Sequence, residues 1–214
     1  MKSSGIVFKA RQHAIDPGNV YGDVSRNKAV CTPTALTYTQ IGSIWVPTWG
    51  TAGANVAVDN PVVDTGDITL SMWLYPIGAG IGTSIGRIMS NGQFRVFTVG
   101  PTDSYQVISD GTTTADSAVN SLILNTWVHL FITRTGAGVT NIYLDTILSG
   151  AADQDSGTPV VGTNLYIGNR STADRTYQGY NDALEIWGHI PDNPAGFVIE
   201  KHNEHAGIYG KPLI

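Results

Sequence analysis

The segment NTWVHLFITRTGAGVTNIYLDTILSG, from Asn125 to Gly150, has the pattern of two β-strands joined by a polar turn that contains glycine. Its first half, TWVHLFITR, places apolar or aromatic side chains at most positions, so both faces of the expected strand are hydrophobic. Side chains of a strand alternate between its two faces, and apolar residues on both indicate a strand that is covered on both sides. The segment therefore predicts a hairpin at the centre of a layered β-protein.

The same alternation continues on either side of this hairpin, in DITLSMWLY, QFRVFTV, SYQVIS, NLYIG and YNDALEIWG. Short turns such as SNGQ separate these segments, which is typical of antiparallel hairpins. One helix is expected near the C-terminus, where Asn193 can cap it, Pro194 can occupy its first turn and Gly207 can end it. The fold class predicted is all-β, a two-sheet antiparallel sandwich with one short C-terminal helix.

The composition fits a single domain over residues 1–214, long enough to bury a core without disulfides. The formal net charge is −5 and no cluster of Lys and Arg is visible, which argues against a nucleic-acid partner. No run of 18 apolar residues occurs, so no membrane-spanning helix is expected. The N-terminal MKSSGIVFKARQHA lacks the apolar centre of a secretory signal, which predicts a chain made in the cytosol.

His129 lies in the first strand of the hairpin, where a histidine can be a catalytic base, a metal ligand or a hydrogen-bonded structural residue. No carboxylate or second histidine lies beside it at the spacing of a metal site, so the structural role is expected. In the second strand, Tyr-Leu-Asp is followed by Thr146. A two-residue hairpin turn needs positive φ there, which a β-branched residue resists, so a longer turn supported by Asp145 is expected.

Four segments in order resemble the laminin-G-like, concanavalin A-like jelly-roll family. They are DITLSMWLYP, the hairpin quoted above, NLYIGNR, and the stretch YQGYNDALEIWGHIPDNPAGFVIEKHNEHAG. The resemblance implies a curved jelly-roll sandwich in which the hairpin is scaffold. It implies little about activity, because the family includes lectins, adhesion modules, glycosidase-linked domains and viral surface proteins.

Asp182 is the candidate metal ligand. In GYNDALEIW it has the same strand phase as Leu184 and Ile186, which predicts an inward-facing carboxylate that needs a partner. The resemblance implies a structural calcium near this strand, and Asp16 and Asp23 are the candidate helpers. Loop amides are the alternative partners, because Ala183 stands where the family has its second acid.

Exposed aromatic side chains are candidates for a sugar-stacking platform, because sugars present apolar C–H faces to aromatic rings. The candidates are Trp45, Trp49, Tyr105, Tyr177 and Tyr180. The alternative is that each fills the core, which is the role expected for Trp73 and Trp127.

The chain is expected to be non-catalytic. None of the common nucleophile, zinc or phosphate-loop motifs occurs. A retaining glycosidase needs two carboxylates close together, and strict alternation would place Asp182 and Glu185 on opposite faces of their strand.

The first functional hypothesis is a virion surface protein of a bacteriophage, either a capsid decoration or a tail-fibre component. Solitary, weakly charged sandwiches rich in Thr and Gly resemble such proteins. This hypothesis expects location in the virion, other virion proteins as partners, a homo-oligomer in the assembly and binding of host glycans. Residues 1–39 are then either a docking arm or an ordinary first strand, GIVFKA, with a wrapping loop. The alternative is a bacterial carbohydrate-binding module or lectin, and a third is an enzyme with an unrecognised site.

Overall fold

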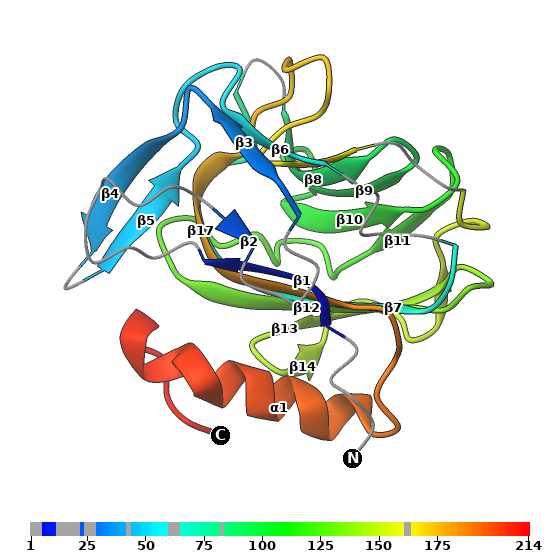
Figure 1. The fold of residues 1–214 in the computed structure, drawn as a ribbon. Coiled ribbons are helices and arrows are strands. Elements are labelled where there is room, and N and C mark those ends of the chain that lie inside the picture. The colour runs from blue at the N-terminus through cyan, green and yellow to red at the C-terminus, as the bar shows by residue number, and fades with distance from the viewer. Residues whose placement is uncertain are drawn as a thin grey trace.

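The computed structural model describes residues 6–11, 22–23, 29–41, 44–59, 65–81, 84–160 and 164–214. Two antiparallel sheets pack face to face, and one α-helix lies against the outer side of the larger sheet (Figure 1). The predicted all-β sandwich with a short C-terminal helix is therefore confirmed. No helix within the described ranges is long and apolar enough to cross a membrane.

The larger sheet contains ten of the described strands, in the central order β14-β13-β12-β7-β17-β1-β2. In addition, β5 pairs with β17 and β4, and β15 pairs with β13. The strands are β1 (Ile6–Arg11), β2 (Gly22–Asp23), β4 (Thr37–Ile41), β5 (Ile44–Thr48), β7 (Ile68–Gly78), β12 (Val128–Arg134), β13 (Val139–Leu144), β14 (Ile147–Leu148), β15 (Gln154–Asp155) and β17 (Gln178–Trp187).

The smaller sheet contains seven of the described strands, in the order β11-β10-β9-β8-β16-β6-β3. The turn predicted from SNGQ joins β8 to β9, with Asn91 paired to Phe94 and Gly92 at a φ of 63°. The strands are β3 (Cys31–Thr34), β6 (Asn55–Val58), β8 (Ile85–Asn91), β9 (Phe94–Val99), β10 (Ser104–Ile108), β11 (Thr114–Asp116) and β16 (Leu165–Ile167).

The main core lies between the two sheets and is built by alternate residues of their strands. On β7, Leu70, Met72 and Leu74 point into it and are fully buried. On β12, Leu130 and Ile132 do the same. This alternation is the one that the sequence predicted, and burial of these side chains is the main force that holds the sheets together.

The opposite face of the larger sheet is covered by α1 (Pro194–His205) and the following 3-10 helix η1 (Ala206–Tyr209). Asn193 caps α1 by accepting a hydrogen bond from the Gly196 N–H at 3.1 Å, as predicted. The α-helix ends at His205, close to the predicted stop at Gly207, and the chain continues as η1, which Gly210 ends at a φ of 68°.

A second hydrophobic cluster lies between the larger sheet and η1. Trp73 stacks on His129 with ring centroids 5.1 Å apart, and Tyr209 contacts Trp73 and Trp127 at 4.6 Å and 4.3 Å. Trp73 and Trp127 are thus core residues, as expected. Because this cluster covers the outer side of β7 and β12, the central strands are apolar on both faces, which explains the pattern of the hairpin segment.

The turn of the hairpin differs from its prediction. Leu144 pairs with Ile147, so the turn has two residues, Asp145 and Thr146, with φ values of 45° and 75°. The expectation of a longer turn is therefore wrong. The Asp145 carboxylate accepts hydrogen bonds from the His129 N–H at 2.9 Å and from the Lys211 ammonium at 2.7 Å, and these contacts hold the turn in its strained form.

A β-bulge in β17 reverses the prediction for Asp182. Asp182 pairs with Trp73 and Glu185 with Ser71, so β17 has one residue more than β7 between these pairs. Ala183 takes up the extra length at a φ of 50°. Asp182 and Glu185 consequently both face the helix side, and the expectations that Asp182 faces the main core and that the two acids lie on opposite faces are wrong.

Part of the N-terminal segment belongs to the sandwich. The GIVFKA region forms β1, which pairs with β17, and Asp23 pairs with Ala10 through β2. The ordinary first strand is therefore confirmed, while Asp16 and the proposed wrapping loop lie outside the described residues. A docking role for residues 1–39 stays a prediction.

Candidate functional site

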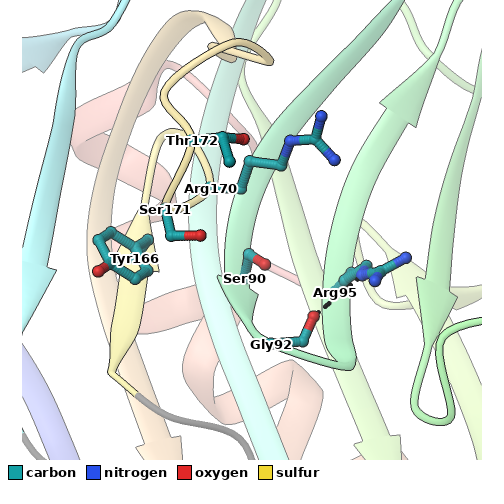
Figure 2. A pocket seen from close by; sticks show the side chains of 7 residues that line it. All are labelled: Ser90, Gly92, Arg95, Tyr166, Arg170, Ser171 and Thr172. Carbon is teal, nitrogen blue, oxygen red and sulfur yellow. Dashed lines mark hydrogen bonds between the residues drawn. The ribbon is translucent and has the colours of Figure 1, made fainter.

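A cavity of about 150 Å³ lies on the outer face of the smaller sheet, the face away from the helix (Figure 2). It sits where the β8–β9 hairpin, strand β16 and the loop after β16 meet. Its lining residues are Ser90, Gly92, Arg95, Tyr166, Arg170, Ser171 and Thr172. We call this the arginine–tyrosine site.

Strand alternation places Arg95 and Tyr166 at this site. Arg95 lies between Phe94 and Val96, which are both buried in the core, so its side chain emerges on the outer face. Tyr166 lies between two core residues of β16 in the same way, and it pairs with Ser90 of β8. The site therefore rests on three adjacent strands of a packed sheet, which fix its side chains more firmly than a loop does.

The β8–β9 turn holds Arg95. Its Nε–H donates a hydrogen bond to the Gly92 carbonyl at 3.0 Å, and its Nη1 reaches the Gly111 carbonyl at 3.5 Å. The first of these bonds is drawn in Figure 2. A guanidinium has five N–H donors, and these two bonds are the ones that Arg95 makes as a side-chain donor within the described residues, so three donors are left for a ligand there.

The loop after β16 is held by its own hydrogen bonds. Arg170 donates from Nε and Nη2 to the two oxygens of Asp174, each at 2.5 Å. The Thr172 hydroxyl also donates to Asp174, at 2.7 Å, and the Asn169 side chain accepts from the backbone N–H of Arg170. These bonds lower the pKa of Asp174 and raise that of Arg170.

Two further arginines lie beside the site. Arg87 is 5% exposed and places its guanidinium 4.2 Å from the centre of the Phe97 ring, and its backbone N–H donates to the Arg175 carbonyl at 2.8 Å. Within the described part of the chain, no acceptor lies at Nε or Nη1 of Arg87, or at Nε of Arg175. Burial, followed by the charges of Arg95, Arg175 and Arg170, lowers the pKa of Arg87 to about 9.

A second cavity of about 190 Å³ opens near the hairpin turn of the larger sheet. Its walls are mainly apolar, with the Lys211–Asp145 ion pair at 2.7 Å on one side. It is lined by Ser121, Ile123, Thr126, Trp127, Val128, Leu144, Asp145 and Lys211. Trp127 lines this cavity but is only 6% exposed, so it offers a ligand little aromatic surface.

The predicted aromatic platform is wrong for three of its five members. Trp49, Tyr105 and Tyr177 are fully buried in the main core. Trp49 donates its Nε1–H to Asn181 at 2.9 Å, so it fills the interior and is not an exposed loop residue. Trp45 and Tyr180 are half-buried on the larger sheet, and neither lines one of these two cavities.

The surroundings of Asp182 do not fit a calcium ligand. Its Oδ2 accepts from the Tyr209 hydroxyl at 2.5 Å and its Oδ1 from the Ala183 N–H at 2.8 Å, while the side chain is fully buried. Among the residues that the structure describes, no group of three or more His, Cys, Asp or Glu side chains can hold a metal ion. Asp16 and the side chain of Asp23 lie outside the description, so their part in a calcium site stays a prediction.

His129 is the buried structural histidine that the sequence predicted. Its Nε2 lies 2.8 Å from the Ser71 hydroxyl, and both residues are covered by the helix layer at 0% and 4% exposure. Burial and the nearby His202, His205 and Lys201 lower the pKa of His129 to about 3. The Ser–His pair therefore stabilises the packing under α1 and is out of reach of a substrate.

Sequence reasoning missed the arginine–tyrosine site. Arg95 in QFRVFTV and Tyr166 in NLYIG each stand between core residues, and the alternation rule assigns both to the outer face. The signal was therefore present in the sequence, although neither residue was among the predicted candidates. The pairing of β8, β9 and β16 is what brings the two residues together, and it depends on contacts distant in sequence.

The two-sheet antiparallel sandwich described above agrees with the sequence comparison. Residues 50–191 match the family model of the concanavalin A-like lectin/glucanases superfamily. The chain belongs to this superfamily. No match was found among curated proteins.

Solved structures with the same fold include binding domains of bacterial toxins. The binding domain of Paraclostridial Mosquitocidal Protein 1 has a TM-score of 0.69 at 12% identity, covering 97% of this chain and 55% of that one. The botulinum neurotoxin serotype G binding domain gives 0.69 at 13%, with 97% and 54% covered. The serotype D ligand-binding domain, in complex with N-acetylneuraminic acid, gives 0.68 at 12%, with 97% and 55% covered. The chain thus spans about half the length of these domains, and the likeness concerns the fold.

Proposed function

We propose that this chain is a glycan-binding, lectin-like domain and that the arginine–tyrosine site is where the glycan binds. The observation that carries the proposal is the site itself, a small polar cavity on the face of the sandwich that no described helix covers, with a half-buried Tyr166 on its wall. A tyrosine ring stacks on the apolar face of a sugar, and hydroxyl and guanidinium groups bond to its oxygens. The cavity fits one terminal sugar unit better than a long chain.

The lining supplies the polar groups that such a sugar needs. Ser90, Ser171 and Thr172 offer hydroxyls that donate or accept, and the two guanidinium groups donate. Figure 2 shows Tyr166 and Ser171 on one side of the cavity and Gly92 and Arg95 on the other. One structural neighbour, the serotype D ligand-binding domain, is in complex with N-acetylneuraminic acid, which supports a glycan as the class of ligand.

A glycan array with the whole protein tests this proposal. We expect binding to a subset of glycans, and we expect Tyr166→Ala to reduce it by about tenfold, because the stacking surface is lost. Tyr143→Ala is the matched control, since Tyr143 is also a half-buried strand tyrosine but lies on β13 of the other sheet. Binding that is absent, or that both variants reduce equally, would contradict the proposal.

For the biological setting, we propose a virion surface protein of a bacteriophage, non-catalytic and docked on other virion proteins. The support is exposed apolar side chains on the segment before β12 and on β14, with Ile123 63%, Leu124 44% and Ile147 72% exposed. Exposed apolar surface is a common feature of protein–protein contacts. A bacterial carbohydrate-binding module or lectin is the alternative.

Mass spectrometry of purified particles of a phage that encodes this chain tests the setting. We expect the protein in the particles at a fixed stoichiometry and also expect the substitution Ile147→Asp to reduce its incorporation. Its absence from the particles would favour the bacterial module. The non-catalytic part of the proposal predicts that a bound glycan has the same mass before and after prolonged incubation.

A further inference from the structure

We propose that the ligand of the arginine–tyrosine site is an acidic glycan, one whose terminal sugar has a carboxylate, sulfate or phosphate group. This inference rests on the proposed glycan-binding function and names the class of sugar. It is carried by the concentration of arginine at one place and by the shortage of acceptors around it among the described residues.

The distribution of charge over the molecule is the first argument. The chain has seven arginines and a formal net charge of −5, yet four arginines gather on this part of the smaller sheet. They are Arg87, Arg95, Arg170 and Arg175. A positive cluster on a negative protein favours ligands of opposite charge and speeds their association.

The engagement of the neighbouring carboxylate is the second argument. Asp174 is the acid that bonds with this cluster, and both its oxygens already accept hydrogen bonds from Arg170. These two bonds leave Arg170 with three further N–H groups, because a guanidinium has five donors and no acceptor. The site therefore presents more donors than acceptors. A neutral sugar both donates and accepts, whereas an anionic group only accepts and matches this surplus.

The buried arginine beside the cavity is the third argument. Arg87 is almost fully buried and lacks acceptors at Nε and Nη1 in the described part of the chain. Its pKa is lowered by burial and by the three other arginines. A bound anion would reduce this repulsion, so the unliganded site holds positive charge in an arrangement that an acidic ligand stabilises.

The roles of the four arginines differ. Arg95 and Arg170 line the cavity and would hydrogen-bond to the anionic group directly. Arg87 and Arg175 are not among the lining residues, so they would contribute charge without contacting the ligand directly. Charge-assisted bonds from Arg are about twice as strong as neutral ones, which is why loss of Arg95 is expected to have a larger effect than loss of a lining hydroxyl.

The experiment compares matched sugars. Binding of lactose, lactose with a terminal N-acetylneuraminic acid, and 3′-sulfated lactose is measured by isothermal titration with the whole protein. We expect one or both acidic sugars to bind at least about tenfold more tightly than lactose. The titration is repeated at salt concentrations of about 50 and about 500 mM. Binding of the acidic sugars is expected to weaken at the higher concentration, because ions screen the charges of the arginines. The two acidic sugars distinguish a carboxylate from a sulfate.

Three substitutions locate the effect. Arg95→Gln is expected to lower the affinity for the acidic sugar at least about tenfold and to change the affinity for lactose little. Asp174→Asn removes the acid that bonds with the cluster and is expected to raise affinity for the acidic sugar about twofold to fivefold. Lys211→Gln removes one positive charge at the other cavity and is the matched control, with no expected effect.

The outcomes separate this inference from the function on which it rests. Neutral glycans that bind as well as acidic ones, with Tyr166→Ala still reducing binding, would overturn the acidic class and leave the lectin function standing. A loss of acidic-sugar binding in Lys211→Gln equal to that in Arg95→Gln would overturn the assignment to this site. No binding to any glycan, or preferential binding of a single-stranded oligonucleotide used as a phosphate-rich probe, would overturn both proposals.

Discussion

The outer faces of the two sheets have opposite characters. The larger sheet carries Trp73, His129 and Glu185 on its outer face, and α1 and η1 cover them almost completely. The smaller sheet carries Arg95 and Tyr166 on its outer face, and no helix of the described chain lies over it. The outer face of the larger sheet is therefore buried under the helices, whereas the outer face of the smaller sheet is not covered by a described helix.

The difference teaches how this sandwich separates stability from binding. On the covered face, His129 and Asp182 have partners inside the protein, which are Ser71 and Tyr209. On the smaller sheet and its loop, Arg87 and Arg175 have donors with no acceptor among the described residues. Substitutions on the covered face should therefore alter the free energy of unfolding, while those on the open face should alter ligand affinity.

The largest effect is expected at Trp73. Trp73→Ala should lower the free energy of unfolding by about 3–5 kcal/mol, because it leaves a cavity among His129, His202 and Tyr209. Urea unfolding measures this loss of stability. Ile147→Ala is the control: Ile147 is 72% exposed, so its substitution should change the free energy of unfolding by less than about 0.5 kcal/mol. Glycan affinity of the folded fraction should stay unchanged. A loss of affinity would show that the two faces are coupled.

The pH dependence of stability should come from the covered face. The pKa of His129 is lowered to about 3, so the unfolded chain takes up this proton near pH 6.5 while the folded chain does not. The free energy of unfolding therefore falls as the pH drops through this window, by up to about 1.4 kcal/mol per pH unit from this group. The charged and titratable groups around it are Lys201, His202, His205, Glu204, Glu185 and Lys9.

Urea unfolding between pH 7 and 5 measures this slope. Asp110 and Asp174 do not interfere in this window. Their pKa values are lowered, so their contribution to stability is lost only when they are protonated at lower pH. Proton NMR of the His129 ring is the direct check, since its resonances should keep their neutral positions down to pH 5. A His129 ring that titrates near pH 6.5 in the folded protein would show that the face is open to solvent.

A smaller effect is expected from the Tyr209 hydroxyl. Tyr209→Phe removes the donor to Asp182 Oδ2 and leaves this buried carboxylate with a weaker set of partners. The free energy of unfolding should fall by about 1–3 kcal/mol. Tyr143→Phe, at a half-buried residue of β13, is the control and should be nearly neutral. Equal effects of the two would mean that the Asp182–Tyr209 bond adds nothing.

The period-two pattern was sufficient to predict the sandwich, its core residues on β7 and β12, and the helix capped by Asn193. It failed where one residue breaks the period. The bulge at Ala183 moved Asp182 to the other face, and no propensity marks an alanine for positive φ. At Thr146 the intrinsic preference was also overruled, because the contacts of Asp145 hold the two-residue turn.

The candidate site was harder to predict than the fold. Arg95, Tyr166 and Arg170 are 71 and 4 positions apart along the chain and meet only through strand pairing and the loop after β16. Pro47, Thr48 and Gly50 flank Trp49, and from this loop-like setting the sequence left exposure and core burial equally open. In the structure it is fully buried, and its ring lies so close to Gly168 that a Cβ there would meet it at 2.1 Å.

The smallest effect is expected from calcium. Both oxygens of Asp182 accept hydrogen bonds from Tyr209 and Ala183 on the covered face, so a cation would have to displace these donors before it could bind. The melting temperature in calcium should therefore equal that in EDTA within about 1 °C, well below the several degrees that 1 kcal/mol produces. A higher melting temperature in calcium that Asp182→Asn abolishes would place the metal at Asp182. An increase that survives Asp182→Asn would instead direct attention to the segment that contains Asp16 and Asp23.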